Sequence, residues 1–527
     1  MNYLKRYLLI TLVFIFITIC NIVFAQEEEL LPEPQVIYIH EEIFIQEEIY
    51  IQKLNGQEIY VINSFEFFID GITKSYALNY ITNFRTGEEI KGMANLEKFI
   101  RDKTQLIHNE RVIESIRIEY AIAEAGEDGK YPVDLKIYVK DTWNIIALPY
   151  PKYDSNSGLS LTIKARDYNF LGTMNPLRID VGYQRDIQGR NFYNFMLDSN
   201  FLFYFFGLNW NVDFDHDYTF RPDLELAHYY KNVTGISAEL PFKRTVFTFG
   251  FAESIFLNHE YETKKFHKGL YLSSRPYISW RIPVGINYYD FGELIYTPSL
   301  SATINHEFPR WSLPEELKGP FINFSHLIGF SRVDWHGNFR KGASAYVSNS
   351  ISMDFFKLKN NNNPWGASLT INGRGYTMFN SFSGLTAQIT YRHHFFDNYD
   401  SSSGDYVRGI IDSKINADSM LSFNFDFPVR VLQVRPSTWS ERNRFLRIFD
   451  LDLIISPIID LALYNDPVRN IPFSFENLLI GGGLEVIVYP ERWRSLFLRI
   501  SFAMGLQTGN LGDGFSREIF IGMDLFY

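Results

Sequence analysis

The sequence predicts a transmembrane antiparallel β-barrel of about sixteen strands, preceded by one small α+β domain. Three observations support this fold class. Phe, Trp and Tyr make up 17% of the 527 residues, a content typical of barrels with aromatic girdles at both membrane interfaces. Apolar and polar residues alternate along much of residues 142–527. Residues 518–527 alternate in the same way and end on an aromatic ring, as expected of the strand that closes a barrel. Gly522, Leu525 and Tyr527 lie in this predicted closing strand.

Residues 1–25 have the features of a secretory signal peptide. Two basic residues precede an apolar run, and Val23 and Ala25 stand at the −3 and −1 positions of a candidate cleavage site. Lipidation of Cys20 is disfavoured because Ile19 precedes it where a small residue is needed. Cleavage after Ala25 would remove the chain's single cysteine, so the mature protein is predicted to contain neither disulfides nor thiolate metal sites.

Residues 26–58 are interpreted as an acidic, extended lead-in. Residues 39–44 and 45–50 repeat a six-residue pattern rich in Ile and Glu. Two copies are too few for a solenoid, which needs about three stacked units.

Residues 59–141 are predicted to form a small α+β domain. Strand-like segments at 60–69, 116–123 and 133–139 enclose two segments, 76–84 and 96–108, with apolar residues at helical spacing. The helix pair would cover one face of a three-stranded sheet. An edge strand, 116–123 or its neighbour, would remain open to accept an extended peptide. The alternative is an inert spacer domain.

From residue 142 to 527 the hydrophobic period is two. Residues 177–184 show the pattern clearly, with apolar side chains at odd positions and polar or small ones at even positions. Lipid-facing and lumen-facing positions would alternate in this way. A soluble sandwich, the alternative, would expose large apolar patches to water. With about ten residues per tilted strand and about fourteen per connection, about sixteen strands fit.

Composition and motifs exclude several functions. The chain has 50 Lys and Arg against 61 Asp and Glu, a net charge of −11, which gives no electrostatic footprint for nucleic acid. Neither a Gly-x-Ser-x-Gly elbow nor a phosphate-binding glycine loop is present. His393 and His394 lack the carboxylate spacing of a metal site, and Asp450 and Asp452 are interpreted as lumen charges. We therefore predict no catalytic, cofactor or metal site.

Three features follow one another in a fixed order. They are the α+β unit of residues 59–141, the sequence Asp-Tyr-Asn-Phe-Leu-Gly at 167–172, and the sequence Asp-Tyr-Val-Arg-Gly-Ile at 405–410. Together they resemble the BamA/TamA superfamily of outer-membrane assembly factors, also called the bacterial surface antigen family. The first is similar to a POTRA domain and the second to the family's turn after the second barrel strand. The third, with Val407, Arg408, Gly409 and Ile410, is similar to the Val-Arg-Gly-aromatic tip of a loop that folds into the lumen.

Later segments fit the same template. Residues 423–429 resemble the family's strand after the loop, residues 454–463 carry Asp460 where the family has an aspartate, and residues 481–484 resemble its glycine-rich penultimate strand region. Ile410 replaces the usual aromatic residue, and Asn424 stands where Glu is common. Only one POTRA-like unit is evident, so a specialised or accessory member is expected.

The resemblance implies insertion of outer-membrane proteins or transport of polypeptides. Unfolded outer-membrane protein clients and outer-membrane lipids would be the partners, together with accessory periplasmic proteins. The barrel would lie in the bacterial outer membrane and the N-terminal domain in the periplasm. The barrel would open laterally between its first strand, near 144–153, and its last, near 519–527. The alternatives are a two-partner-type secretion transporter and a passive porin or surface antigen.

A charged side chain at the loop tip needs a partner. Arginine is always charged and offers a planar fork of donors, so Arg408 in a lumen would require a carboxylate. Strand parity places Asp426 on the lumen side of its strand, and the same argument applies to Asp460. We therefore predict that Arg408 pairs with Asp426 or Asp460, and that Gly409 allows the sharp turn of the tip. The alternative is an ordinary exposed loop arginine.

Overall fold

The computed structural model describes residues 58–522. Excepted are the short segments 155–157, 225–226, 259–268, 288–291, 309–312, 314–316, 397–398, 411–413, 440–448, 492–496 and 508–513. The predicted signal peptide, nearly all of the lead-in, Leu525 and Tyr527 lie outside the described residues. The described chain forms two compact units, one of residues 145–167 and 176–522 and a smaller one of residues 58–144 and 168–175.

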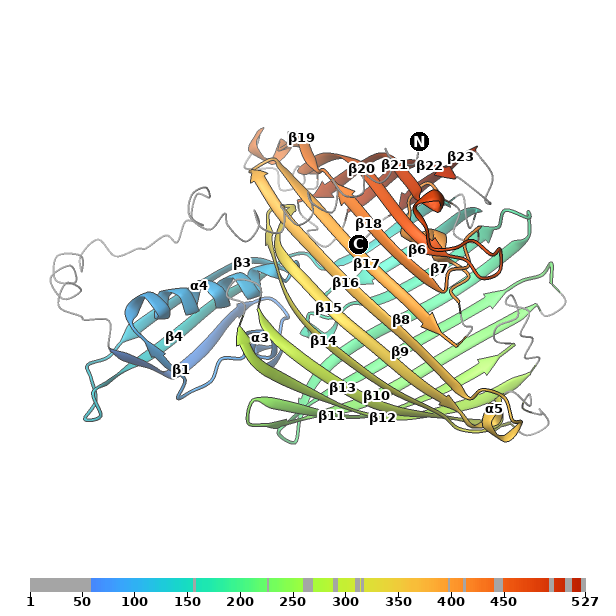
Figure 1. Cartoon of the computed structure of the whole chain (residues 1–527). Helices are drawn as coiled ribbons and strands as arrows, with labels where there is room; N and C mark the ends of the chain where they lie inside the picture. The colour runs from blue at the N-terminus through green and yellow to red at the C-terminus, as the bar shows by residue number, and fades with distance from the viewer. Residues whose placement is uncertain are drawn as a thin grey trace. The chain divides into compact units, whose positions relative to one another are not determined.

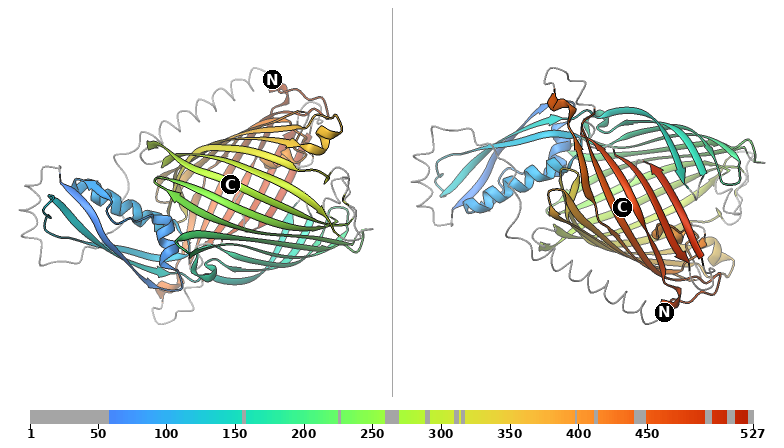
Figure 2. Two further views of the ribbon diagram at one scale, coloured as in Figure 1. Left: turned by 90° about the horizontal axis from the view of Figure 1, so that it is seen from below. Right: turned by 90° about the horizontal axis from the view of Figure 1, so that it is seen from above.

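The larger unit is a closed antiparallel β-barrel, as predicted (Figure 1). Among the described residues, nineteen strand segments form its ring in the order β10 to β23 and then β5 to β9. Their bounds are β5 (Ile145–Asp154), β6 (Gly158–Asp167), β7 (Leu177–Arg185), β8 (Asn191–Phe205), β9 (Leu208–Phe220), β10 (His228–Phe242), β11 (Thr245–Leu257), β12 (Leu270–Asn287), β13 (Glu293–Glu307), β14 (Phe321–His336), β15 (Phe339–Asp354), β16 (Trp365–Asn380), β17 (Ser383–Phe395), β18 (Ser419–Asp426), β19 (Val429–Val434), β20 (Leu451–Asn465), β21 (Leu479–Pro490), β22 (Leu498–Gln507) and β23 (Gly514–Gly522). Figure 2 shows the strands crossing the barrel wall obliquely.

Two of these segments are pieces of one strand. Both β18 and β19 pair with β17 on one side and with β20 on the other. Phe427 and Pro428 separate them, and a proline has no N–H to give to the ladder. The described ring therefore has eighteen strand positions, an even number as an antiparallel ring requires.

The prediction of about sixteen strands was too low. Four connections are two-residue turns, far shorter than the averaged connection on which the prediction rested. These turns are residues 206–207, 243–244, 337–338 and 381–382. Phe206 and Gly207 have φ of +50° and +77°, as the tight turns that match the twist of a hairpin require. Short turns leave room for more strands in the same length of chain.

The outer face of the barrel is apolar. On β6, Leu159, Leu161 and Ile163 are 50%, 55% and 61% exposed, whereas Thr162 between them is buried. A strand with its apolar side outward suits hydrocarbon and not water. This polarity excludes the soluble sandwich.

Short helices occupy some connections of the chain. They are α5 (Phe355–Lys359) and the 3₁₀ helices η1 (Phe170–Gly172), η5 (Ser403–Tyr406), η7 (Pro436–Trp439) and η9 (Phe475–Asn477). None of the helices in the described part of the chain combines the length and the apolar character needed to cross a bilayer.

The smaller unit is an α+β sandwich of one sheet and two helices, as predicted. Its elements are β1 (Ile59–Asp70), α3 (Ser75–Thr82), β2 (Glu89–Lys91), α4 (Met93–Asn109), β3 (Ile113–Ile122) and β4 (Lys130–Asp141). The sheet order is β2-β1-β4-β3, with β1 and β4 parallel. The sheet thus has four strands where three were predicted, because the three residues of β2 are too few to show a period.

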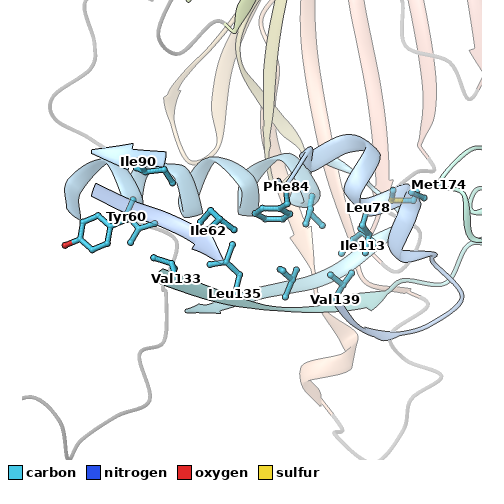
Figure 3. Close-up of a cluster of buried hydrophobic side chains, with 14 of the residues drawn as sticks. Tyr60, Ile62, Leu78, Phe84, Ile90, Ile113, Val133, Leu135, Val139 and Met174 are labelled. Atoms are coloured by element: carbon cyan, nitrogen blue, oxygen red, sulfur yellow. The ribbon is translucent and has the colours of Figure 1, made fainter. Parts of the chain in front are cut away.

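Helices and sheet enclose one hydrophobic core (Figure 3). On the helices, Leu78, Leu96 and Ile107 are buried, as the helical spacing predicted. Alternate residues of β4, among them Val133 and Leu135, face them across the core. Met174, from the connection between β6 and β7, is part of the same core.

The sheet of the smaller unit has two open edges among the described strands. β3 pairs only with β4, and β2 covers β1 only along Ile59, Tyr60 and Val61. Edge strands of this kind can accept a further strand.

Candidate functional site

The described part of the connection between β17 and β18, residues 399–410 and 414–418, packs against the inner wall of the barrel. Val407, Ile410, Ile415 and Ala417 of this loop are buried in a hydrophobic cluster with four side chains of the wall: Met420, Ala462, Tyr464 and Leu479. Those on β18 and β20, which are Met420, Ala462 and Tyr464, point to the same side of the wall as Asn424 and Asp460. Asn424 and Asp460 lie opposite each other on these two strands. The loop is therefore held inside by apolar packing on both sides of its Arg408-Gly409 tip.

Arg408 binds Asp460 with two parallel hydrogen bonds. Its Nε lies 2.8 Å from Asp460 Oδ2 and its Nη2 lies 2.7 Å from Oδ1. The backbone N–H of Arg408 donates to Oδ2 as well, at 2.8 Å. The two side chains are 4% and 0% exposed. A buried bidentate pair of this kind fixes both position and orientation of the loop tip.

Two further carboxylates face the same guanidinium. Nη1 of Arg408 lies 2.7 Å from Asp426 Oδ1 and 3.3 Å from Glu485 Oε1. Glu485 also binds Arg499, at 3.1 Å. The structure thus brings Arg408 to both residues that the sequence offered as alternatives, and to a third. We call Arg408, Asp426, Asp460 and Glu485 the lock.

Glycines make room for the tip. Gly409 has φ of +93°, and a Cβ there would lie 2.5 Å from the carbonyl carbon of Met504 on β22. A Cβ on Gly481 would overlap the carbonyl oxygen of Arg408, and one on Gly505 would lie 2.6 Å from that of Gly409. The backbone of the tip therefore rests directly on the backbone of β21 and β22.

The tip also reaches the last strand. Gly409 N–H donates to Glu518 Oε2 at 2.7 Å, and the hydroxyl of Ser516 donates to the Gly409 carbonyl. On the other side, Asn424 Nδ2 donates to the carbonyl of Tyr406 at 2.9 Å. The loop tip thus bridges β18, β20, β21, β22 and β23.

Sequence reasoning missed Glu485, Arg499 and Glu518. A signal existed for Glu485, because it shares the strand parity of Gly481 and Gly483, which face the lumen on β21. Glu518 stands among the even, polar positions of the closing strand, and these positions also point inward. Arg499 gave no motif of its own.

The ring is closed by the pairing of β23 with β5, which we call the seam. Among the described residues, its register includes Phe520 with Asp154 and Ile521 with Tyr153. A Cβ on Gly522, at the end of the described part of β23, would approach the hydroxyl of Tyr150 on β5.

Within the described ranges, no group of three or more His, Cys, Asp or Glu side chains is arranged to hold a metal ion. His393 and His394 lie on opposite faces of β17, as alternation in a strand requires.

No family model matches the sequence, and no curated protein matches it. Solved structures are similar to the chain. CdiB from Acinetobacter baumannii has 12% identity and a TM-score of 0.48, and the match covers 88% of this chain and 74% of that one. BamA from Haemophilus ducreyi lacking POTRA domains 1–3 has 12% identity and a TM-score of 0.38, with 88% and 84% covered. CdiB from Escherichia coli has 10% identity and a TM-score of 0.41, with 89% and 91% covered.

Proposed function

We propose that this protein is a bacterial outer-membrane β-barrel of the BamA/TamA type that inserts outer-membrane proteins or transports polypeptides. In this proposal the smaller unit is a POTRA-like domain in the periplasm, and the clients are unfolded outer-membrane proteins. Outer-membrane lipids surround the barrel, and accessory periplasmic proteins are further candidate partners. The observation that carries the proposal is the loop tip that the lock binds inside the barrel.

The seam is where the first and the last strand of the barrel meet. An unpaired backbone group in hydrocarbon costs several kcal/mol. β5 and β23 would therefore part where a client strand takes up the backbone groups that they release. Such an opening would let a client strand pair with the barrel on its way into the membrane.

The contacts of the loop tip support opening at the seam. The loop tip joins β18, β20, β21, β22 and β23 through buried contacts. β23, on one side of the seam, is thus bound to the loop inside the barrel.

The open edges of the smaller unit support capture of a client in the periplasm. An extended polypeptide could add to β3 or to the uncovered part of β1 by main-chain hydrogen bonds, which depend little on the client's sequence. This suits a protein with many clients.

Depletion of the protein, followed by a census of outer-membrane proteins, tests the proposal. Loss of many barrel proteins is the expected result, and restoration by the full chain is the control. Loss of a single exported protein would instead favour a two-partner-type secretion transporter. An unchanged census, together with full activity after deletion of residues 59–141, would favour a passive porin or surface antigen and contradict the proposal.

A further inference from the structure

The connection between β6 and β7, residues 168–175, belongs to the smaller unit although its flanking strands belong to the barrel. Met174 is part of the core of the smaller unit, and Tyr168 packs against that core. The carbonyl of Gly172 accepts a hydrogen bond from Lys74 N–H at 2.9 Å. Gly172 has φ of +78°, and a Cβ there would overlap the carbonyl oxygen of Ile72. The connection is therefore docked in close backbone contact with the segment that precedes α3.

Asn169 fastens this connection from inside. Its side chain is 0% exposed. Nδ2 donates to Thr73 Oγ1 at 2.7 Å and to Asp141 Oδ2 at 3.3 Å, and Oδ1 accepts from Met174 N–H at 2.8 Å. The carboxamide thus uses both its donors and its acceptor in a place that water does not reach.

Asp141 completes the arrangement at the end of β4. Its Oδ2 accepts from the backbone N–H groups of Ile72 and Thr73 at 2.8 and 3.0 Å, and its Oδ1 accepts from Thr73 Oγ1 at 2.6 Å. We call Asn169, Thr73 and Asp141 the clasp. Loss of the Asn169 side chain would leave the buried Met174 N–H without its acceptor and would remove the link to Thr73, which is costly.

The clasp lies next to the two chain ends of the hairpin formed by β5 and β6, where the chain enters β5 and leaves β6. β5 begins directly after Asn144, the last residue of the smaller unit's main segment, and β6 ends directly before Tyr168. The N–H of Tyr168 donates to the carbonyl of Asn144 at 2.9 Å, so the residue before β5 and the residue after β6 are also bonded to each other. β5, the outer strand of this hairpin, is the strand that forms the seam with β23.

We infer that the clasp couples the smaller unit to the seam. A displacement of the smaller unit is transmitted through Asn169 to the start of β5 and to the end of β6. β5 therefore cannot stay in place while the unit moves. Asn169 is thus a positioning residue for the opening of the barrel. This inference rests on the proposed function for its purpose, whereas the contacts of the clasp are observed in the structure.

A reversible disulfide across the clasp, which we call the staple, tests the coupling in the full-length protein. The mature chain is predicted to lack cysteine, so Thr73→Cys with Asn169→Cys gives a single possible disulfide across the clasp. Hydrogen exchange of peptides from residues 145–167 is measured in the oxidised and the reduced form of the same sample. We expect exchange in the reduced form to be about tenfold faster, because the start of β5 and the end of β6 open locally once the clasp is gone. Peptides from β13 to β16, on the far strands of the ring, should exchange equally in both forms.

Single variants provide a second comparison if the staple does not form. Asn169→Ala should accelerate exchange of residues 145–167 in the same way. Leu171→Ala is the matched control, because Leu171 lies in the same connection and its side chain is 56% exposed. Equal exchange of residues 145–167 in both staple states, or in Asn169→Ala and Leu171→Ala, would overturn the inference. Because exchange is read without any client, this outcome is distinct from a failure of the proposed function.

Discussion

At the residue scale, the lock shows how a buried positive charge is balanced by carboxylates placed around it. Its guanidinium binds Asp460 in bidentate fashion and approaches Asp426 and Glu485 with the remaining nitrogen. Only arginine offers this planar fork; a lysine ammonium is a single point charge. The loop position is therefore specified by one side chain to a degree that apolar packing alone would not provide.

Replacing Arg408 by Ala should release the loop tip. The change leaves buried carboxylates without their cation, which typically costs about 3–5 kcal/mol. Arg408→Lys should recover only part of this, because one ammonium cannot serve the same set of oxygens. The measurement is the temperature at which the detergent-solubilised barrel loses its heat-modifiable migration.

Arg178→Ala is the control for this prediction. Arg178 pairs with Asp198 at 2.9 Å, but the two side chains are 47% and 35% exposed, so the pair contributes about 0–1 kcal/mol. If Arg408→Ala and Arg178→Ala lowered the transition temperature equally, the special role of the lock would be refuted.

Gly481→Ala should displace the tip by a different route. A Cβ at this position overlaps the carbonyl oxygen of Arg408, and overpacking of this kind costs about 1–3 kcal/mol. Faster proteolysis of residues 396–418 is the expected readout. Gly375→Ala on β16 is the matched control, because a Cβ there meets no atom within 4 Å. Equal proteolysis of the two variants would show that Gly481 is not needed for the close approach.

Glu110, at the C-terminal end of α4, should make the smaller unit less stable as the pH rises. Burial raises the pKa of its carboxyl to about 7. Since the folded pKa lies above the unfolded value of about 4.3, the folded state holds the proton more tightly. The contribution of Glu110 to stability is therefore fully present below about pH 4 and is lost as the pH rises through 7, by at most about 4 kcal/mol.

Pulse proteolysis of the smaller unit in urea across this pH range measures the effect. Glu110→Gln should flatten the profile and stabilise the unit above pH 7, since the amide carries no charge at any pH. A wild-type profile that is already flat between pH 4 and pH 7 would contradict the assignment.

At the scale of elements, period and parity predicted the strands and helices well, and failed where the signal is short or long-range. The three residues of β2 carry no period, and so the fourth strand of the small sheet was not foreseen. The two-residue turns of the barrel left eighteen strand positions where averaged connections suggested fewer. Parity did place Asp426 and Asp460 on the lumen side, and the structure puts both beside Arg408.

The clasp was beyond sequence reasoning for a physical reason. Asn169 stands in a connection between two barrel strands, and the predicted boundaries assign it to the barrel. Its partner Thr73 lies 96 residues earlier and Asp141 lies 28 residues earlier. Nothing in local spacing reports such a pairing. For Glu485 a local signal did exist, because it shares the lumen-facing positions of Gly481 and Gly483 on β21.

A disulfide across the seam should abolish the proposed activity. Tyr153 and Ile521 are register partners on β5 and β23, so cysteines at these positions face each other at a distance that a disulfide can bridge. Oxidation should stop insertion of client barrels, and reduction should restore it. Growth after depletion of the native protein, with and without reductant, is the measurement.

The control shares one of the two substitutions. Tyr153→Cys with Leu159→Cys joins register partners within the β5–β6 hairpin and leaves the seam free. Insertion should continue when this control is oxidised. Normal growth with the oxidised seam disulfide would mean that the barrel does not open between β5 and β23.

At the scale of the whole molecule, the two sides of the seam are held by different devices. Gly409 of the loop tip binds Glu518 and Ser516 of β23 inside the barrel, and the clasp lies directly beyond the ends of β5 and β6 in the smaller unit. The seam thus lies between two strands that are held independently of each other, which is the arrangement expected of a ring that opens at one place.

The same arrangement predicts low conductance from a wide barrel. Rings of 16–18 strands leave an aqueous channel when nothing fills them, but here residues 399–410 and 414–418 pack against the inner wall and the lock holds their tip. Replacing residues 403–410 by a Gly/Ser linker should therefore raise single-channel conductance in planar bilayers about threefold or more. Arg408→Ala should give frequent openings to the same level, and Arg178→Ala should behave like the wild type. A wild-type conductance as high as that of the linker variant would show that the loop does not obstruct the lumen, and would favour a passive porin over the insertase that we propose.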